Sequence, residues 1–218
     1  MYFWRSWPKI NEKMNWGIVG LGNIARSFLE DMRLLKDQQV LACASRSISN
    51  AEFFAKDYSI PKYYGKYNEL FDVEEVDIVY IATTHDTHAQ LSIEAMEKGK
   101  HVLCEKPMAV NSNDAKKMIA AAQHNGVFLM EAFWSRFNPS IRSVLEHIIN
   151  GDIGDVKYIN ADFTFLGVER AKDRLLNPNL AGGALLDIGV YPLFLAYVVL
   201  GLPSEICSTD ILLSLIHI

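Results

Sequence analysis

Residues 15–25 read Asn-Trp-Gly-Ile-Val-Gly-Leu-Gly-Asn-Ile-Ala. The apolar run Asn15–Val19 is typical of a buried strand, and the glycines that follow lead directly into a helix pattern. In such a turn the first glycine permits a tight bend, the second lets phosphates approach the backbone, and a small third residue lets helix and strand pack closely. The pattern predicts a nucleotide site, and the alternative is a tight turn without a ligand. The residues expected to contact the nucleotide here are Gly20, Gly22, Asn23, Ile24 and Ala25.

Strand and helix patterns continue to alternate up to Met130. The further strands are expected at Val40–Ala44, Val76–Ala82, His101–Cys104 and Val127–Met130, and the helices at Asn23–Lys36, Ser49–Tyr58, Thr87–Lys98 and Asn113–Asn125. The expected helix caps are Ser49 or Asn50, Ser112 or Asn113, and the terminating glycines Gly99 and Gly126. This order predicts an α/β fold, a doubly wound parallel sheet covered by helices on both faces, over residues 14–134.

A different pattern begins near residue 135. Ile141, Val144 and Ile148 share one face of a helix that Gly151 can close. Residues 157–165 then alternate between polar and apolar side chains, which predicts a half-buried strand of an antiparallel sheet. Since one strand cannot make a sheet, residues 135–212 are expected to be part of an incomplete α+β domain.

Both ends of the sequence are expected to lie outside the fold. Residues 1–13 lack the apolar segment of a signal peptide, and Met14 directly precedes the first strand, so we expect a disordered or misassigned extension. Residues 213–218 read back as the codons CTG-TCT-CTT-ATA-CAC-ATC, the end of a transposase adaptor used for sequencing libraries. The hypothesis is that these residues are an artefact and that the second domain is truncated.

Composition narrows the class of partner. The chain has 218 residues, 50% of them hydrophobic, and a formal net charge of −5. With no run of like charges, this argues against nucleic acid or an anionic membrane surface as partner. No stretch approaches the roughly 20 apolar residues that a membrane-spanning helix needs. We therefore expect neither a nucleic-acid nor a membrane partner.

The cysteines do not form a framework. Cys43 and Cys104 lie in apolar strand patterns, Cys207 lies apart, and there is no CxxC motif and no zinc-type spacing with histidine. We expect these cysteines to be small buried residues whose thiols stay reduced. The sequence therefore predicts a cytoplasmic protein without a metal site.

The end of the second strand bears on cofactor choice. Sheets that bind NAD usually carry an acidic residue about 20 residues after the glycines, on the ribose 2′-hydroxyl. Here the chain reads Ala44-Ser45-Arg46-Ser47, with no acid. A serine hydroxyl and an arginine guanidinium would hold a 2′-phosphate that a carboxylate would repel. Ser45 and Arg46 therefore favour NADP over NAD, unless Arg46 is an ordinary solvated loop residue.

A third motif, Glu105-Lys106-Pro107, follows the strand at His101–Cys104. Ligands of open α/β folds bind at the carboxyl ends of parallel strands. A lysine there can donate to a substrate oxygen and polarise it, although a plain surface lysine is the common alternative.

Five stretches together resemble the Gfo/Idh/MocA oxidoreductase family. They are Gly20-x-Gly22-x-x-Ala25, Ala82-Thr83-Thr84-His85 with His88, Gly99 to Pro107, Glu131 to Pro139, and Gly182 to Pro192. The last two are similar to the branch that contains dimeric dihydrodiol dehydrogenase and NADP-dependent D-xylose dehydrogenase. The resemblance covers residues 14 to about 212 and implies a Rossmann domain followed by a substrate and dimerisation domain.

The resemblance implies a catalytic pair, Lys106 and Tyr191. Many family members have histidine in place of Tyr191. A phenol ordinarily has a pKa near ~10, and a nearby ammonium stabilises the phenolate and lowers that pKa. Tyr191 could then take the substrate hydroxyl proton while the nicotinamide takes the hydride. Asp187, four residues earlier, would contact substrate or hold Lys106, and its alternative role is a helix cap.

The remaining site residues are expected around this pair. Thr83, Thr84, His85, His88, Glu105 and Lys106 would contact the cofactor, and Trp134, Arg136, Phe137, Asp187 and Tyr191 the substrate. His85 and His88 also fit as turn and cap residues, and the aromatic residues as packing between domains. The implied activity is a dehydrogenase for a sugar or cyclic diol, homo-oligomeric at full length. The alternative is a non-catalytic NAD(P)-binding regulator on the same scaffold.

Overall fold

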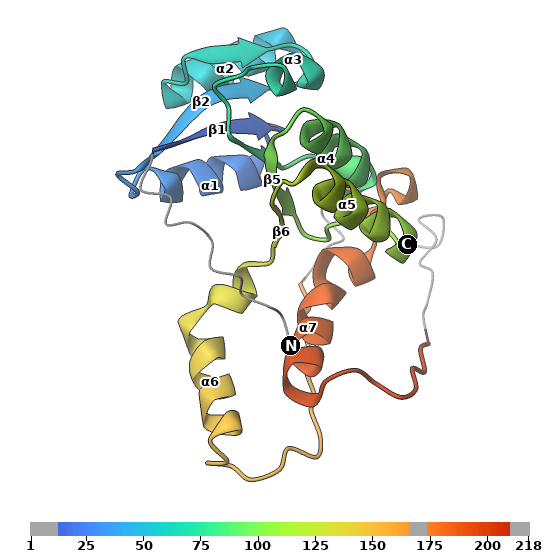
Figure 1. Cartoon of the computed structure of the whole chain (residues 1–218). Coiled ribbons are helices and arrows are strands. Elements are labelled where there is room, and N and C mark those ends of the chain that lie inside the picture. The colour runs from blue at the N-terminus through green and yellow to red at the C-terminus, as the bar shows by residue number, and fades with distance from the viewer. Residues whose placement is uncertain (1–12, 166–173, 210–218) are drawn as a thin grey trace. The chain divides into compact units, whose positions relative to one another are not determined.

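A computed structural model describes residues 13–165 and 174–209 (Figure 1). The chain divides into two units: Met1–Trp134 with Leu166–Asp187, and Ser135–Phe165 with Ile188–Ile218. The stretch that ends at Asp187 thus belongs to the first unit, although it follows part of the second in sequence. The N-terminal extension up to Glu12 and the segment at 213–218 lie outside the described residues.

The first unit is built on a six-stranded sheet. Its strands are β1 (Met14–Val19), β2 (Gln38–Ala44), β3 (Lys62–Tyr64), β4 (Ile78–Ile81), β5 (His101–Glu105) and β6 (Leu129–Ala132). Their order is β3-β2-β1-β4-β5-β6, and every neighbouring pair is parallel. The order reverses between β1 and β4, where such sheets bind ligands beyond the carboxyl ends of the strands. The predicted doubly wound fold is confirmed.

Helices cover both faces of this sheet because strand residues alternate in direction. Val79 and Ile81 of β4 face one core, with residues of α3 (Tyr67–Phe71), α4 (His88–Glu97) and α5 (Ser112–Asn125). Tyr80, between them, faces the other core, with residues of α1 (Asn23–Met32) and α2 (Ile48–Tyr58). Both strand cysteines, Cys43 and Cys104, are fully buried in these cores, as predicted, and burial raises the pKa of each thiol to about 12.

Helix ends differ from the predictions by one to four residues. The N-caps are Ser47 and Asn111, one or two residues before the first predicted candidates. Their side chains accept hydrogen bonds from Asn50 N and Asp114 N. The first helix ends at Met32, short of the predicted Lys36. Both predicted terminating glycines have positive φ, +75° at Gly99 and +64° at Gly126. The left-handed backbone there is the conformation glycine adopts without strain.

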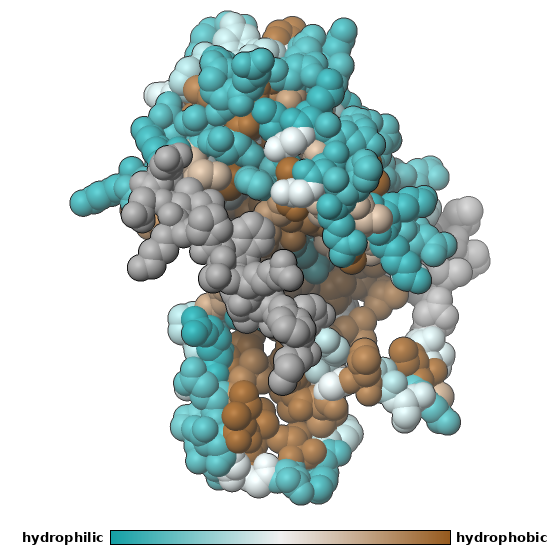
Figure 2. Space-filling view, viewed as in Figure 1, coloured by the Kyte–Doolittle hydropathy of each residue, from teal (hydrophilic) through white to brown (hydrophobic). Residues whose placement is uncertain are grey.

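The described part of the second unit contains two α-helices and little core. These are α6 (Pro139–Ile149), capped by the Asn138 side chain, and α7 (Val190–Leu200). Among its described residues only Ser135 is buried. Apolar side chains lie at the surface of this unit, as Figure 2 shows.

The predicted strand at residues 157–165 is wrong. The structure has no strand there, and Tyr158 is 79% exposed. A strand needs a hydrogen-bonding neighbour, and the described part of the second unit supplies none.

Contrary to the expectation from sequence, one stretch of the chain is long and apolar enough to cross a membrane. Within the described residues, the stretch Pro178–Leu200 has 23 residues, and its apolar 18-residue window has a mean hydropathy of 1.9 and is not buried. By length and composition alone it could cross a membrane, a test that core helices of other proteins also pass. Asp187 lies inside this stretch, which places a carboxylate in its middle.

Candidate functional site

A cavity of about 1020 Å³ lies at the carboxyl ends of β1, β2 and β4, in the first unit. Eight predicted cofactor residues line it: Gly20, Gly22, Asn23, Ile24, Ser45, Arg46, Thr83 and Thr84. The predicted Ala25 is fully buried beneath the turn, and His85, His88, Glu105 and Lys106 lie outside the cavity lining. The cavity therefore stands where the glycine motif predicted a nucleotide.

The two glycines of the motif have different surroundings. Gly20 has a φ of +88°, and a Cβ there would lie 2.6 Å from the backbone of Ala82. A Cβ at Gly22 would meet no atom within 4 Å, so it would project into open space at the start of α1. Gly22 thus leaves room for a group against the positive end of the helix, as a pyrophosphate requires.

Two arginines line the cavity, and among its described lining residues there is no carboxylate. Arg26 on α1 is engaged elsewhere, since its Nη1 lies 3.4 Å from Asp57 Oδ2 and its guanidinium stacks over Phe54. Arg46 is exposed at the end of β2, beside the half-buried Tyr67. The pKa of the Tyr67 phenol is raised by burial, and the Arg46 guanidinium opposes that rise. An anionic ligand group would meet Arg46 without carboxylate repulsion.

Several lining residues were not predicted as cofactor contacts, among them Asn50, Tyr67, Thr87 and Leu175. Asn50 sits one turn into α2, close behind the Ser45–Arg46 pair, and this spacing could have identified it. Tyr67 begins α3, which the sequence patterns did not predict, and Leu175 reaches the cavity from a segment distant in sequence.

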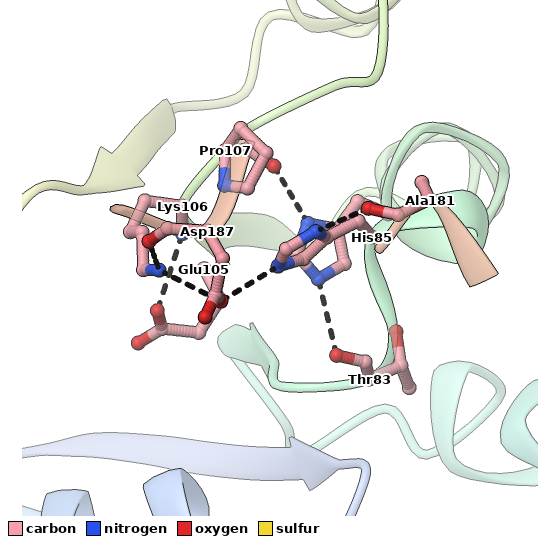
Figure 3. A network of polar contacts seen from close by, with 8 residues as sticks. Thr83, His85, Glu105, Lys106, Pro107, Ala181 and Asp187 are labelled. Atoms are coloured by element: carbon pink, nitrogen blue, oxygen red, sulfur yellow. Dashed lines mark hydrogen bonds and ion pairs between the residues drawn. The ribbon is translucent and has the colours of Figure 1, made fainter. Parts of the chain in front are cut away.

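Lys106 and Asp187 meet although they lie 81 residues apart. Lys106 Nζ donates to Asp187 O at 2.6 Å and lies 3.5 Å from Asp187 Oδ1 (Figure 3). Their side chains are 14% and 12% exposed. Asp187 therefore contacts Lys106, and α7 has Gly189 rather than Asp187 at its N-cap. A contact of Asp187 with substrate stays a prediction.

The turn that carries Lys106 is held by two partly buried carboxyl groups. Glu105 accepts from Tyr80 Oη at 2.6 Å and from the backbone N of Lys106 at 3.2 Å. Glu131 accepts from Met108 N at 2.7 Å. Burial raises the pKa of both carboxyl groups, while these donors and the Lys106 charge oppose the rise. Glu105 and Glu131 thus hold the two ends of the turn around Pro107.

Two histidines complete this region. His88 is fully buried, with Nδ1 2.8 Å from Pro107 O and Nε2 3.3 Å from Thr83 O. His85 is 3% exposed, with Nδ1 3.2 Å from Ala181 O and Nε2 3.9 Å from Asp187 Oδ1. Figure 3 shows the Lys106 amine and the His85 ring approaching Asp187 from opposite sides.

The predicted substrate residues other than Asp187 are divided between the units. Trp134 is 58% exposed and is the last residue of the first segment of the first unit. Arg136 and Phe137 lie on the same 3-10 helix as Trp134 but belong to the second unit. Tyr191 belongs to the second unit, where its ring meets Phe163 edge-on at 5.2 Å. Its pairing with Lys106 stays a prediction. Within the described ranges, no group of three or more metal-ligating side chains converges.

Comparison with protein families gives two matches. Residues 14–133 match the Gfo/Idh/MocA oxidoreductase family, NAD-binding Rossmann fold, and residues 141–210 match the Gfo/Idh/MocA C-terminal domain. The membrane-length stretch Pro178–Leu200 therefore falls inside a region that matches a known domain of this family.

Curated relatives include trans-1,2-dihydrobenzene-1,2-diol dehydrogenases. The mouse protein is 43% identical over 82% of this chain and 54% of its own length, and the human protein is 40% identical over 82% and 53%. The chain thus spans about half the length of the curated relatives it matches.

Solved structures of similar fold include two oxidoreductases. Aldose-aldose oxidoreductase from Caulobacter crescentus has a TM-score of 0.76 and 30% identity, over 87% of this chain and 58% of that one. KijD10, a 3-ketoreductase from Actinomadura kijaniata in complex with NADP, has a TM-score of 0.75 and 31% identity, over 87% and 56%.

Proposed function

Because the chain belongs to the Gfo/Idh/MocA oxidoreductase family, we propose that its parent protein is an NADP-dependent dehydrogenase. It would transfer a hydride between nicotinamide and a hydroxyl-bearing carbon of a sugar or cyclic diol. The substrate class follows from the relatives, which are named for a diol in one case and for aldoses in another.

The residues that line the cavity support the choice of NADP over NAD. Ser45 and Arg46 offer a hydroxyl and a guanidinium, and no described lining residue carries a negative charge. A guanidinium binds phosphate through paired, charge-assisted hydrogen bonds. The NADP complex of KijD10 supports the same choice. Gly20, Gly22 and the start of α1 would hold the pyrophosphate, and Thr83 and Thr84 would line the path beyond it.

The residues of the chain would handle the proton. Bound NADP supplies the hydride acceptor. Tyr191 would accept the substrate hydroxyl proton at its phenol oxygen as the hydride leaves, and return it in the reverse direction. Lys106 would stabilise the phenolate with its ammonium charge and donate to the substrate oxygen. Asp187, which contacts Lys106, would hold that amine in place.

The proposal is tested by titrating the purified chain with NADPH and with NADH. Arg46→Ala is expected to weaken NADPH binding by roughly tenfold or more through loss of charge-assisted hydrogen bonds, and to leave NADH binding unchanged. Arg26→Ala is the matched control, since Arg26 lines the same cavity but pairs with Asp57. Equal losses for both nucleotides, or for both variants, would contradict a 2′-phosphate contact at Arg46.

A substrate screen on the full-length protein separates the enzyme from the regulator. Turnover of a sugar or diol that Lys106→Ala abolishes is the expected result. Nucleotide binding without turnover of any such substrate would favour the non-catalytic regulator. Cytoplasmic location, homo-oligomeric assembly and the lack of a membrane partner remain part of the same proposal.

A further inference from the structure

The turn after β5 is fixed at three successive backbone positions by the partly buried Glu105 and Glu131 and the buried His88. Glu105 accepts from Lys106 N, His88 Nδ1 contacts Pro107 O, and Glu131 accepts from Met108 N. Glu131 lies on the neighbouring strand β6, whereas His88 is the first residue of α4 and also contacts Thr83 O after β4. The imidazole therefore bridges the ends of two adjacent strands.

The position of the proton on the His88 ring decides which of its two contacts, to Pro107 O or to Thr83 O, is a hydrogen bond that the ring donates. Both ring nitrogens face carbonyl oxygens, and a neutral imidazole can donate from only one nitrogen. The contact to Pro107 O is 2.8 Å, against 3.3 Å to Thr83 O, so we assign the N–H to Nδ1. A fully buried ring without this donor bond would leave the Pro107 carbonyl poorly satisfied.

His85 does the same for the other half of the ion pair. Its Nδ1 contacts Ala181 O, and its Nε2 lies 3.9 Å from Asp187 Oδ1. The two rings meet edge-on, with centroids 5.6 Å apart. One ring thus holds the turn of Lys106 and its neighbour holds the segment of Asp187.

We propose that His88, with His85 packed against it, is a positioning residue that sets the Lys106 amine against Asp187 by holding the Lys106–Pro107 turn to the end of β4. The inference rests on the proposed function only for its catalytic meaning, because both partners of the ion pair are residues of this chain. It gives the histidines a role distinct from the cofactor contact expected from sequence.

The test measures the accessibility of Lys106 directly. The cofactor-free protein is acetylated with sulfo-NHS-acetate, and the rate at each lysine is followed by peptide mass spectrometry. His88→Ala is expected to raise the acetylation rate of Lys106 by roughly fivefold, the factor expected when one hydrogen bond is lost. Lys100, which is 6% exposed and donates to Val73 O, should keep its slow rate. Ser92→Ala, buried one turn further along α4, is the matched control and should change neither lysine.

Two conservative variants of His88 show which of its two contacts, to Pro107 O or to Thr83 O, positions Lys106. The amide of His88→Asn can reach the position of Nδ1 and donate to Pro107 O, whereas that of His88→Gln extends towards the position of Nε2 and Thr83 O. Restoration of slow Lys106 acetylation by Asn but not by Gln supports the proposal. Restoration by Gln alone, or unchanged Lys106 in a folded His88→Ala, overturns it, as does a joint rise of Lys106 and Lys100 in every variant.

The wild-type protein provides a measurement that needs no variant. Long-range ¹H–¹⁵N NMR of the His88 ring should show the proton on Nδ1, protected from exchange, and a ring protonated on Nε2 alone would overturn the proposal. None of these readouts requires NADP or substrate. Failure of the proposed enzymatic function would therefore leave the outcome for His88 readable.

Discussion

At the scale of single residues, the two glycines of the nucleotide turn separate folding from binding. Gly20 combines a φ of +88° with backbone atoms 2.6 Å from the position of a Cβ, and Gly22 has no atom within 4 Å of that position. The fold requires a glycine at position 20, whereas Gly22 borders open space in which we propose that a phosphate binds.

Gly20→Ala is expected to destabilise the protein by about 2 kcal/mol or more, from left-handed backbone strain and overpacking. Gly22→Ala should leave the unfolding midpoint unchanged and weaken NADPH binding by roughly tenfold, because its methyl group occupies the phosphate space. Thermal unfolding and nucleotide titration of both variants check this. A destabilised Gly22→Ala, or one that binds NADPH normally, would contradict the assignment.

Glu131 gives stability a defined pH dependence. Burial raises its pKa above the ordinary 4.5, so the folded state keeps this proton to higher pH than the unfolded chain. Its contribution to stability is complete below pH 4.5 and is lost as the pH rises through the raised pKa. Glu131→Gln keeps an oxygen for Met108 N and removes the charge.

The expected result is that Glu131→Gln gains urea resistance relative to wild type as the pH is raised from 4.5 towards neutrality. Part of the wild-type slope should persist, because the pKa of Glu105 is raised in the same direction. The exposed Glu97→Gln is the control, and an identical pH profile for it and Glu131→Gln would refute the argument.

At the scale of elements, the caps show what local sequence determines. Asn111 accepts from Asp114 N at 2.9 Å at the start of α5. Asn111→Ala is expected to cost about 1 kcal/mol of stability. Asn113→Ala, exposed two residues further along, should cost nothing or add slightly, because alanine favours helix more than asparagine does. If both variants lose the same stability in chemical denaturation, the Asn111 cap is not the cause of the loss.

Most of the Rossmann sheet was predictable because each of its strands but β3 is a distinct apolar run between helix patterns. β3 has three residues, Lys62–Tyr64, too few for a period to be visible, and α3 has five. α7 is apolar on all sides, so it shows no helical stripe. The strand at 157–165 alternated correctly but lacks a partner, which a pattern within one segment cannot reveal.

The site was predictable only in part for a related reason. Glycines, Ser45 and Arg46 act within one or two turns of their strands, so spacing identifies them. The sequence suggested the contact between Lys106 and Asp187 as one of several roles for Asp187, but it gave no ground for choosing among them. Nothing in the sequence marks the carbonyl oxygens of Pro107, Thr83 and Ala181, which every residue type offers and which give His85 and His88 their roles.

At the scale of the whole molecule, the two units differ in how much core they have. The first packs helices on both faces of its sheet, whereas the described part of the second buries only Ser135. Stability that depends on buried apolar surface should therefore be concentrated in the first unit.

Limited proteolysis is expected to cleave the segment 150–165 and the residues after α7 first, leaving a resistant fragment that contains β1 to β6. The intact chain should bind NADPH yet turn over substrate weakly or not at all, because Tyr191 sits in the poorly packed unit. Mass spectrometry of the fragments and a turnover assay check both statements. Robust turnover by residues 1–218, or early cleavage within the sheet, would contradict them.

All the described residues that line the cavity belong to the first unit, including Leu175 from the stretch that returns to it. Coenzyme recognition and the second unit can therefore change independently over evolutionary time. Transplanting the second unit of a relative onto this first unit should alter which alcohols are oxidised while the coenzyme preference travels with Ser45 and Arg46.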